Sequence, residues 1–265
     1  MKKNLIYKLT VLLLITFSVN LFSQETTVNS KKKLYIDFLE NNYIVNKDNL
    51  SLITKSKTIE YQNSFLGDIF SIDISNPLRI LIFHKDANQL VFIDNELSPI
   101  GNPINLDALG LADTRVVCSS QINGFWLFNN LNNRIEFYNS KLIKAHSSID
   151  LSQYINSVTD IQEISMSRGK VYLRVKETGI LIFDMFASYI KTIPLKELNS
   201  FQVLDHSILF SKGHQVLVYN FETLSSSVLF QSNSDILYAK LYNASLFYTN
   251  NNNSIEKVNI TSVQK

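Results

Sequence analysis

Residues 123–151, NGFWLFNNLNNRIEFYNSKLIKAHSSIDL, decide the fold of this chain. The stretch contains two strand-like runs, Phe125–Phe128 and Arg134–Tyr138, separated by an asparagine-rich turn. Short apolar runs on either side of such a turn predict two β-strands joined as a hairpin. A more polar run follows at Leu142–Ile149, and Arg115–Ser120 precedes the stretch as a further predicted strand. The unit is therefore expected to contain four strands.

The same layout recurs six times between Leu34 and Lys265. The third strand of each unit closes with an apolar residue just before a polar turn residue, at positions 36 to 45 residues apart: Ile53, Ile93, Tyr138, Phe183, Tyr219 and Val258. Three residues before each of these stands an aliphatic residue: Leu50, Leu90, Ile135, Ile180, Val216 and Ile255. Residues three apart in a strand point to opposite faces, so we expect this strand to be buried on both of its faces.

Repeats of roughly 40 residues with four strands each are typical of a β-propeller. The second strand of each unit is as apolar as the third, whereas the fourth is the most polar, as expected for a blade whose outermost strand meets solvent. Helical repeats would need apolar residues at a 3.6-residue spacing, which this chain lacks. We predict an all-β propeller of six four-stranded blades over residues 34–265. Seven blades, or a long β-sandwich, are the alternatives.

The first 24 residues have the pattern of a secretory signal peptide. Lys2, Lys3 and Lys8 form a basic start, Leu9–Phe22 is apolar, and Ser23-Gln24 ends the expected cleavage region. This apolar run is shorter than the roughly 20 residues that a membrane-spanning helix needs. We therefore expect export to the periplasm or outer cell envelope, with no stable membrane span after cleavage. Residues 25–33 would be a linker or tail before the propeller.

The charge and cysteine content narrow the possible partners. The whole chain has a formal net charge of +2, and its first 24 residues carry three lysines and no acidic residue. The remainder is close to neutral, which argues against nucleic acid as a partner. Cys118 is the only cysteine, so no intramolecular disulfide forms, and its place in a predicted strand indicates a small buried apolar residue.

One copy of the repeat resembles a known family of propellers. The run Asn132-Asn133-Arg134-Ile135-Glu136-Phe137-Tyr138-Asn139 has a polar turn with arginine before the third strand and an aromatic residue at its end. In this it is similar to NHL repeats, and residues 88–94 match more loosely. The resemblance implies a propeller whose role is binding.

A catalytic site would need convergent acids, bases, nucleophiles or metal ligands. No cofactor-binding or nucleophile motif is present. The chain has four histidines, and their spacing is not that of metal ligands: His84, His146, His206 and His214. Asp94 and Asp184 recur at one position of the repeat, with asparagine in other copies, which indicates a side-chain oxygen capping a turn. We therefore predict no catalytic residue, no metal site and no cofactor.

Two long connections between blades carry apolar residues. They are residues 105–113, NLDALGLAD, and residues 150–160, DLSQYINSVTD. Either these apolar residues fold back onto the blades, or they point outward and form a patch on one rim that marks a protein interface. The turns between second and third strands share that rim. The candidate partner-binding residues are Leu109, Leu111, Tyr154, Ile155, His84, Arg134 and His214.

These features favour a non-enzymatic, exported propeller that acts as a protein-interaction scaffold for another envelope protein or complex. An Asn-, Ile- and Lys-rich chain whose leader ends in Ser-Gln looks like proteins of the Bacteroidota. In that phylum, a propeller of the type IX protein-secretion machinery is a concrete candidate. A propeller hydrolase or lyase, or a carbohydrate or small-ligand binding module, is the alternative.

Overall fold

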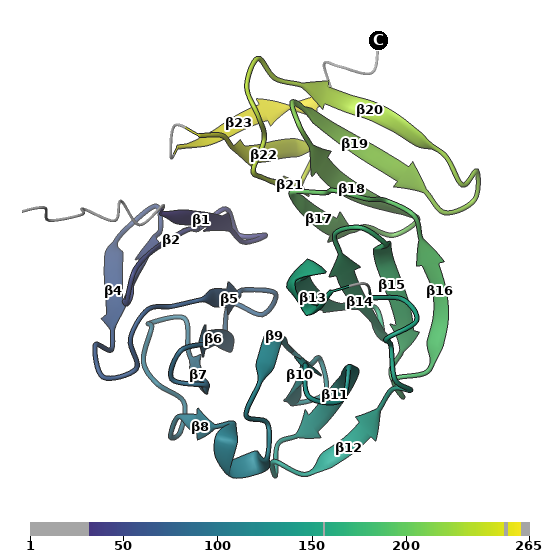
Figure 1. The fold of residues 1–265 in the computed structure, drawn as a ribbon. Helices are drawn as coiled ribbons and strands as arrows, with labels where there is room; N and C mark the ends of the chain where they lie inside the picture. Colours follow the sequence, from purple (N-terminus) through teal and green to yellow (C-terminus); the bar gives the residue numbers. More distant parts are fainter. Residues whose placement is uncertain (1–31, 156, 252–253, 261–265) are drawn as a thin grey trace, which may run out of the picture. The chain divides into compact units, whose positions relative to one another are not determined.

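Short antiparallel strands make up nearly all of the regular structure. The computed structural model describes residues 32–155, 157–251 and 254–260 (Figure 1). The predicted signal peptide and residues 25–31 of the predicted linker lie outside the described residues. In the part that is described, no helix has both the length and the apolar character needed to cross a membrane.

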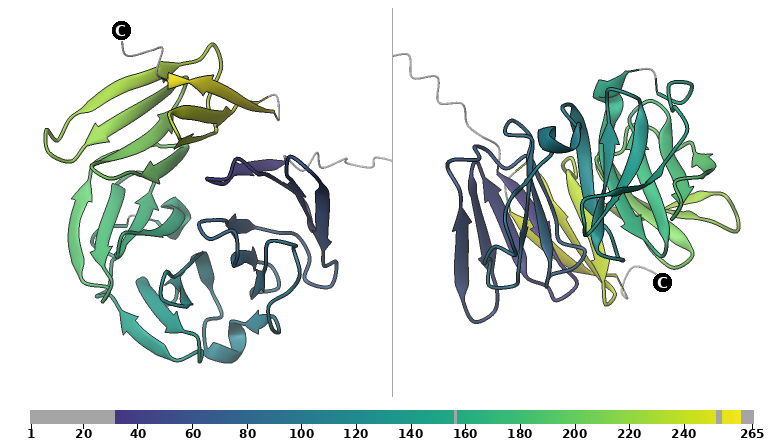
Figure 2. Two further views of the ribbon diagram at one scale, coloured as in Figure 1. Left: turned by 180° about the vertical axis from the view of Figure 1, so that it is seen from behind. Right: turned by 90° about the horizontal axis from the view of Figure 1, so that it is seen from below.

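The strands form six separate sheets, each built from neighbouring strands in chain order. Figure 1 shows the sheets arranged around a common centre, with the first strand of each sheet innermost, and Figure 2 shows the same arrangement from behind and from below. Five sheets have four strands, and the last has three within the described residues. The predicted all-β propeller with six blades is therefore confirmed.

The strands occupy equivalent places in each blade. The innermost strands are β1 (Lys33–Ile36), β5 (Ser71–Asp73), β9 (Thr114–Ser119), β13 (Ile161–Ser167), β17 (Ser200–Val203) and β21 (Tyr238–Tyr242). The second strands are β2 (Asn42–Asn46), β6 (Ile80–His84), β10 (Gly124–Asn129), β14 (Lys170–Val175), β18 (Ser207–Lys212) and β22 (Ser245–Thr249). The third strands are β3 (Asn49–Ile53), β7 (Gln89–Ile93), β11 (Arg134–Asn139), β15 (Gly179–Asp184), β19 (Gln215–Asn220) and β23 (Ile255–Asn259). The outermost strands are β4 (Thr58–Gln62), β8 (Ile104–Asn105), β12 (Lys144–Ser147), β16 (Tyr189–Ile193) and β20 (Ser226–Gln231). Two short 3-10 helices, η1 (Asp107–Leu109) and η2 (Val158–Asp160), lie between blades.

The outer strand of the second blade, β8, is the shortest of the five outer strands that the structure describes. This strand covers only Ile104–Asn105, and Pro99 makes a single bridge to Ile93. Proline has no backbone N–H to give to a ladder, which explains the short pairing. In the last blade, Ile260 follows β23 and is buried in the core beside that blade, and residues 261–265 lie outside the described part of the chain.

The third strands of the second and fourth blades are buried on both faces, as their residue pattern predicted, whereas Ile255 and Val258 in the third strand of the last blade are only partly buried. Ile180 packs in the core between the fourth and fifth blades, whereas Phe183 packs in the core between the third and fourth. Leu90 and Ile93 divide in the same way between the two cores that flank the second blade. The three-residue offset thus supplies one apolar side chain to each neighbouring blade.

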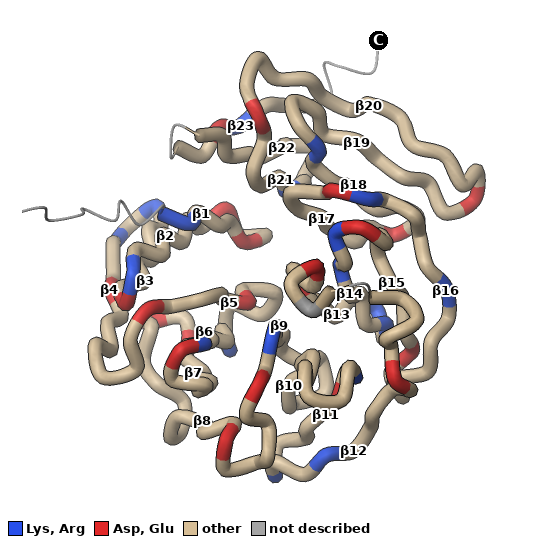
Figure 3. Tube along the Cα trace, in the orientation of Figure 1, with Lys and Arg blue, Asp and Glu red and all other residues tan. Residues whose placement is uncertain are grey.

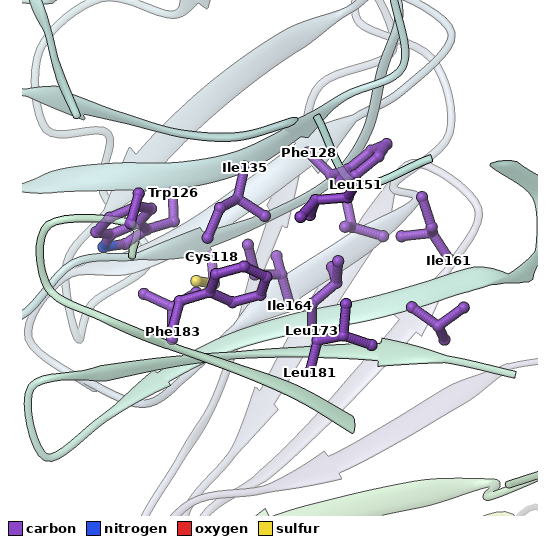
Figure 4. Close-up of a cluster of buried hydrophobic side chains, with 14 of the residues drawn as sticks. Cys118, Trp126, Phe128, Ile135, Leu151, Ile161, Ile164, Leu173, Leu181 and Phe183 are labelled. Carbon is purple, nitrogen blue, oxygen red and sulfur yellow. The ribbon is translucent and has the colours of Figure 1, made fainter. Parts of the chain in front are cut away.

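Cores of this kind fill five successive junctions between blades. Figure 4 shows the largest, in which Cys118, Trp126 and Ile135 of the third blade face Leu173 and Phe183 of the fourth. The junction between the last blade and the first has an edge contact of Tyr35 with Tyr238, whose ring centroids are 5.6 Å apart. Lys257 and Glu40 also form an ion pair across it, 2.9 Å from Nζ to Oε2.

The repeated polar residue after the third strand caps the following turn, as the sequence predicted. Asp94 Oδ1 accepts the backbone N–H groups of Glu96 and Ser98, at 2.9 and 2.8 Å. Asp184 accepts two N–H groups in the equivalent turn, both at 2.8 Å. These carboxylates are engaged in turn formation, two blades apart, and do not form an acid–base pair.

Phe183→Ala tests the core between the third and fourth blades. Phe183 is fully buried, so its truncation leaves a cavity and should lower the free energy of unfolding by about 3–5 kcal/mol. Phe186→Ala, three residues along and mostly exposed, should cost less than about 1 kcal/mol. Urea unfolding followed by tryptophan fluorescence measures both changes. Similar losses for the two variants would contradict the packing described here.

Candidate functional site

The innermost strands start at one rim of the propeller, and a hollow lies where they converge. Its volume is about 420 Å³, and it is lined by residues at or near the starts of the inner strands of the second to sixth blades, with one residue from β14. These are Phe70, Arg115, Thr159, Ile161, Gln162, Arg174, Leu198, Asn199 and Leu237. We refer to the cavity lined by these nine residues as the mouth hollow.

Arg174 is the buried anchor of the mouth hollow. It lies near the end of β14, and its side chain is 11% exposed. Its Nε donates to Glu163 Oε2 at 3.1 Å, and Nη1 donates to the backbone carbonyl of Leu198 at 2.6 Å and to the side-chain oxygen of Gln162. One guanidinium therefore ties β13 and β14 to the segment that leads into the next blade. A buried charge is tolerated only when it is paired in this way.

Arg115 lies at the start of β9 and is half-buried. Its Nε donates to the carbonyl of Ile161 at 3.1 Å, and its Nη2 donates to the carbonyl of Thr159 at 3.2 Å. These bonds hold the third blade to the loop that enters the fourth. Both arginines thus face backbone carbonyls at blade junctions, where the guanidinium fork fits their geometry.

Lysines stand beside the ring of Phe70 at the edge of the mouth hollow. Lys33 Nζ lies 5.0 Å from the ring centroid and Lys85 Nζ lies 4.9 Å from it. Burial, together with the charge of Arg115, lowers the pKa of Lys85, and the carboxylates of Asp113 and Asp86 act in the opposite direction. The pKa of Lys33 is also lowered by burial.

Further charged side chains belong to the inner strands. Lys240 of β21 donates from Nζ to the carbonyl of Phe201 at 2.8 Å, and burial lowers its pKa against the opposing effect of Glu163 and Asp73. Asp73 Oδ2 accepts the backbone N–H of Ser119 at 2.7 Å. Figure 3 shows that basic and acidic segments alternate around the ring and do not gather on one side.

The apolar residues of the two long connections fold back onto the blades. Leu111 and Ile155 are buried, while Leu109 and Tyr154 are partly buried and pack against the cores beside them. Tyr154 also stacks on Tyr189, with ring centroids 4.7 Å apart. Of the two arrangements that the sequence left open, the structure shows the inward one, and the expected outward apolar patch does not form from these side chains.

The three other predicted binding residues lie at the turns between second and third strands. His84 ends β6 and is fully buried, with Nδ1 2.9 Å from the carbonyl of Gly67, so its side chain does not reach the surface at which a partner would bind. His214 is exposed, with Nδ1 3.2 Å from Asp235 Oδ1. Arg134 opens β11 and is partly buried. The structure brings all three to the rim of the mouth hollow, but none of them lines it.

Sequence reasoning missed Arg115 and Arg174 as site residues. A signal was present, because Arg174 interrupts the apolar run 171–175, and a charged residue in a strand that is buried on both sides needs a specific partner. Among the described residues, no group of three or more histidine, cysteine, aspartate or glutamate side chains is placed to hold a metal ion.

Comparison with known proteins identifies the fold. No protein-family model matches the chain, and no curated protein matches its sequence, so the resemblance to NHL repeats stays a prediction. Among solved structures, an inactive variant of virginiamycin B lyase from Staphylococcus aureus with quinupristin is similar, with a TM-score of 0.60 and 13% identity over 88% of this chain and 86% of that one. The WD40 domain of Neurospora crassa Pan2 is similar with a TM-score of 0.60 and 10% identity over 90% and 78% of the two chains. The computationally designed Ika8 protein has a TM-score of 0.53 and 7% identity over 89% and 73%. At these identities the likeness establishes the fold alone.

Cys118 provides a test of whether a reactive thiol exists. The side chain is buried, and burial raises the pKa of the thiol well above its ordinary value, so little nucleophilic thiolate forms near neutral pH. We expect no reaction with Ellman's reagent in the folded chain and one equivalent of reaction in urea. Stoichiometric reaction under native conditions would show that the thiol is accessible.

Arg174→Met tests the anchor of the mouth hollow. The change leaves the Glu163 carboxylate and the Leu198 carbonyl without their donor, and should lower the free energy of unfolding by about 3 kcal/mol. This value is at the low end for a buried pair because the Glu163 side chain is 32% exposed. Arg168→Met removes an exposed ion pair with Asp205 and should cost less than about 1 kcal/mol. Equal urea midpoints for the two variants would contradict the anchoring role.

Proposed function

We propose that this chain is a non-enzymatic, exported β-propeller that serves as a scaffold for another protein or complex of the cell envelope. The mouth hollow is its docking face. A periplasmic component of type IX protein secretion is the most specific form of the proposal, and it rests on the resemblance of the leader and of the composition to proteins of the Bacteroidota.

The chemistry of the lining carries this proposal. Two guanidinium groups, two side-chain amides, a threonine hydroxyl and four apolar side chains surround the mouth hollow. General acid–base catalysis uses groups such as histidine or carboxylates within hydrogen-bond reach of the reacting atoms, and none of the nine lining residues is of that kind. Donors placed on a rigid frame, with apolar surface between them, suit recognition of a bound chain better than chemistry on it.

The frame itself supports a docking role. The lining comes from five blades, and the guanidinium bonds of Arg115 and Arg174 fix neighbouring blades against each other. A partner would therefore meet a surface that is already arranged before binding, which reduces the entropy lost on association.

A hydrolase or lyase is the second candidate, because virginiamycin B lyase shares the fold. Fold alone does not carry an activity from one propeller to another. A carbohydrate or small-ligand binding module has no separate observation in its favour.

Site-specific photo-cross-linking in the native cell tests the docking face. A benzoylphenylalanine at Thr159, an exposed residue of the mouth hollow, should capture one discrete partner protein. The same probe at Lys141, an exposed residue in the turn between β11 and β12 on the opposite rim, should capture none. Recovery of the chain only as a free monomer from both positions would overturn the proposal.

A further inference from the structure

The mouth hollow contains more hydrogen-bond donors than the described residues satisfy. Arginine carries five N–H donors and no acceptor. Arg115 uses Nε and Nη2 for the carbonyls of Ile161 and Thr159, so its Nη1 group has no acceptor among the described residues. Arg174 uses Nε and Nη1, and its Nη2 group is likewise without one in that part of the chain.

The side-chain amides of the lining add further hydrogen-bond donors that have no acceptor among the described residues. The side-chain oxygen of Gln162 already accepts from Arg174, which leaves its NH₂ group as a donor. Asn199 gives one N–H to the carbonyl of Ile236, at 2.8 Å, and keeps the other. A ligand that fits such a lining must bring acceptors, and a carboxylate brings about four acceptor positions in one group.

The charges around the mouth hollow agree with this reading. Its nine lining residues include two cations and no anion. Glu163, the carboxylate nearest to Arg174, is already paired with that residue. At the edge, Lys33 and Lys85 add positive charge beside Phe70, with Asp113 and Asp86 near Lys85 as the opposing groups.

We propose that the mouth hollow binds a carboxylate from an acidic peptide segment of the docking partner. Arg115 is the principal binding residue, and the second guanidinium adds a donor from the facing blade. A guanidinium fork matches a carboxylate with two parallel hydrogen bonds, which a lysine does not reproduce. This inference rests on the proposed function and specifies the chemistry of the partner.

The size and the apolar part of the lining favour a peptide over a free inorganic anion. A hollow of about 420 Å³ is within the range of sites for organic ligands, which begin at roughly 300 Å³. Phe70, Ile161, Leu198 and Leu237 line it beside the donors. The methylene groups of a glutamate and the neighbouring backbone would bury this apolar surface, which a phosphate ion leaves exposed.

Isothermal titration of the purified chain with two blocked peptides tests the proposal. The probes are acetyl-Gly-Glu-Glu-Gly-amide and its neutral counterpart acetyl-Gly-Gln-Gln-Gly-amide. We expect one-to-one binding of the Glu peptide and at least tenfold weaker binding of the Gln peptide. Raising the sodium chloride concentration from 50 to 500 mM should weaken the Glu peptide severalfold and leave the Gln peptide unchanged.

Arg115→Gln should weaken the Glu peptide at least tenfold, and Arg115→Lys should give an intermediate loss because it keeps the charge but not the fork. Lys141→Gln makes the same charge change on the opposite rim and should leave binding unchanged. Circular dichroism and the melting temperature establish that each variant is folded. If Arg115→Gln fails to fold, two other measurements decide whether Arg115 binds the carboxylate. They are the salt dependence of Glu-peptide binding and the affinity of the Arg115→Lys variant for that peptide.

Several results would overturn the inference: equal binding of the two peptides, equal loss in Arg115→Gln and Lys141→Gln, or no binding of the Glu peptide at millimolar concentration. Binding of inorganic phosphate without binding of the Glu peptide would indicate a small-anion site and would also overturn it.

A partner cross-linked from Thr159 together with no peptide binding would support the docking function and contradict only the proposed carboxylate recognition. Peptide binding without any cross-linked partner would remove the docking function instead.

Discussion

Each blade must bury both of its faces, and the rest of the structure depends on that constraint. A four-stranded sheet with apolar side chains on both faces cannot stand alone in water, because burial of apolar surface is the main force that holds a fold together. Ile180 and Phe183 of one third strand serve two different cores, one on either side of the fourth blade. Radial packing of six such sheets gives each of the four middle blades an apolar core on both faces, because five successive junctions contain a continuous apolar core.

The same packing creates the mouth hollow. Every blade runs outward from its first strand, so each connection to the next blade returns to the centre at the same rim. The starts of inner strands from five blades meet there, and their backbone carbonyls need donors because the local sheets do not pair them all. Arg115 and Arg174 supply donors to three of these carbonyls, and both residues line the hollow. Structural support and the proposed binding of a carboxylate therefore depend on the same two side chains.

The fold occurs in proteins of different roles, so the site has to decide the function. Similar structures include a lyase and a WD40 domain, at identities of 13% and 10%. The lining of the mouth hollow consists of arginines, amides, a threonine and apolar side chains. The proposed binding of an acidic segment depends on the two arginines of this lining.

The amino-acid sequence by itself determined the repeat, the six blades and, in the middle blades, the two-sided burial of the third strand, because these depend on the spacing of the repeat and on apolar residues three positions apart within it. It also predicted that Asp94 and Asp184 cap turns and that Cys118 is buried, since each follows from its place in one repeat. Only the tertiary structure decided that Leu111 and Ile155 point inward and that His84 is buried. These side chains are covered by residues distant in the sequence, and local sequence does not show which residues will cover them. The juxtaposition of Arg115 and Arg174 was likewise decided by the packing of the third blade against the fourth, which brings the start of β9 and the end of β14 to one hollow that no local pattern encodes.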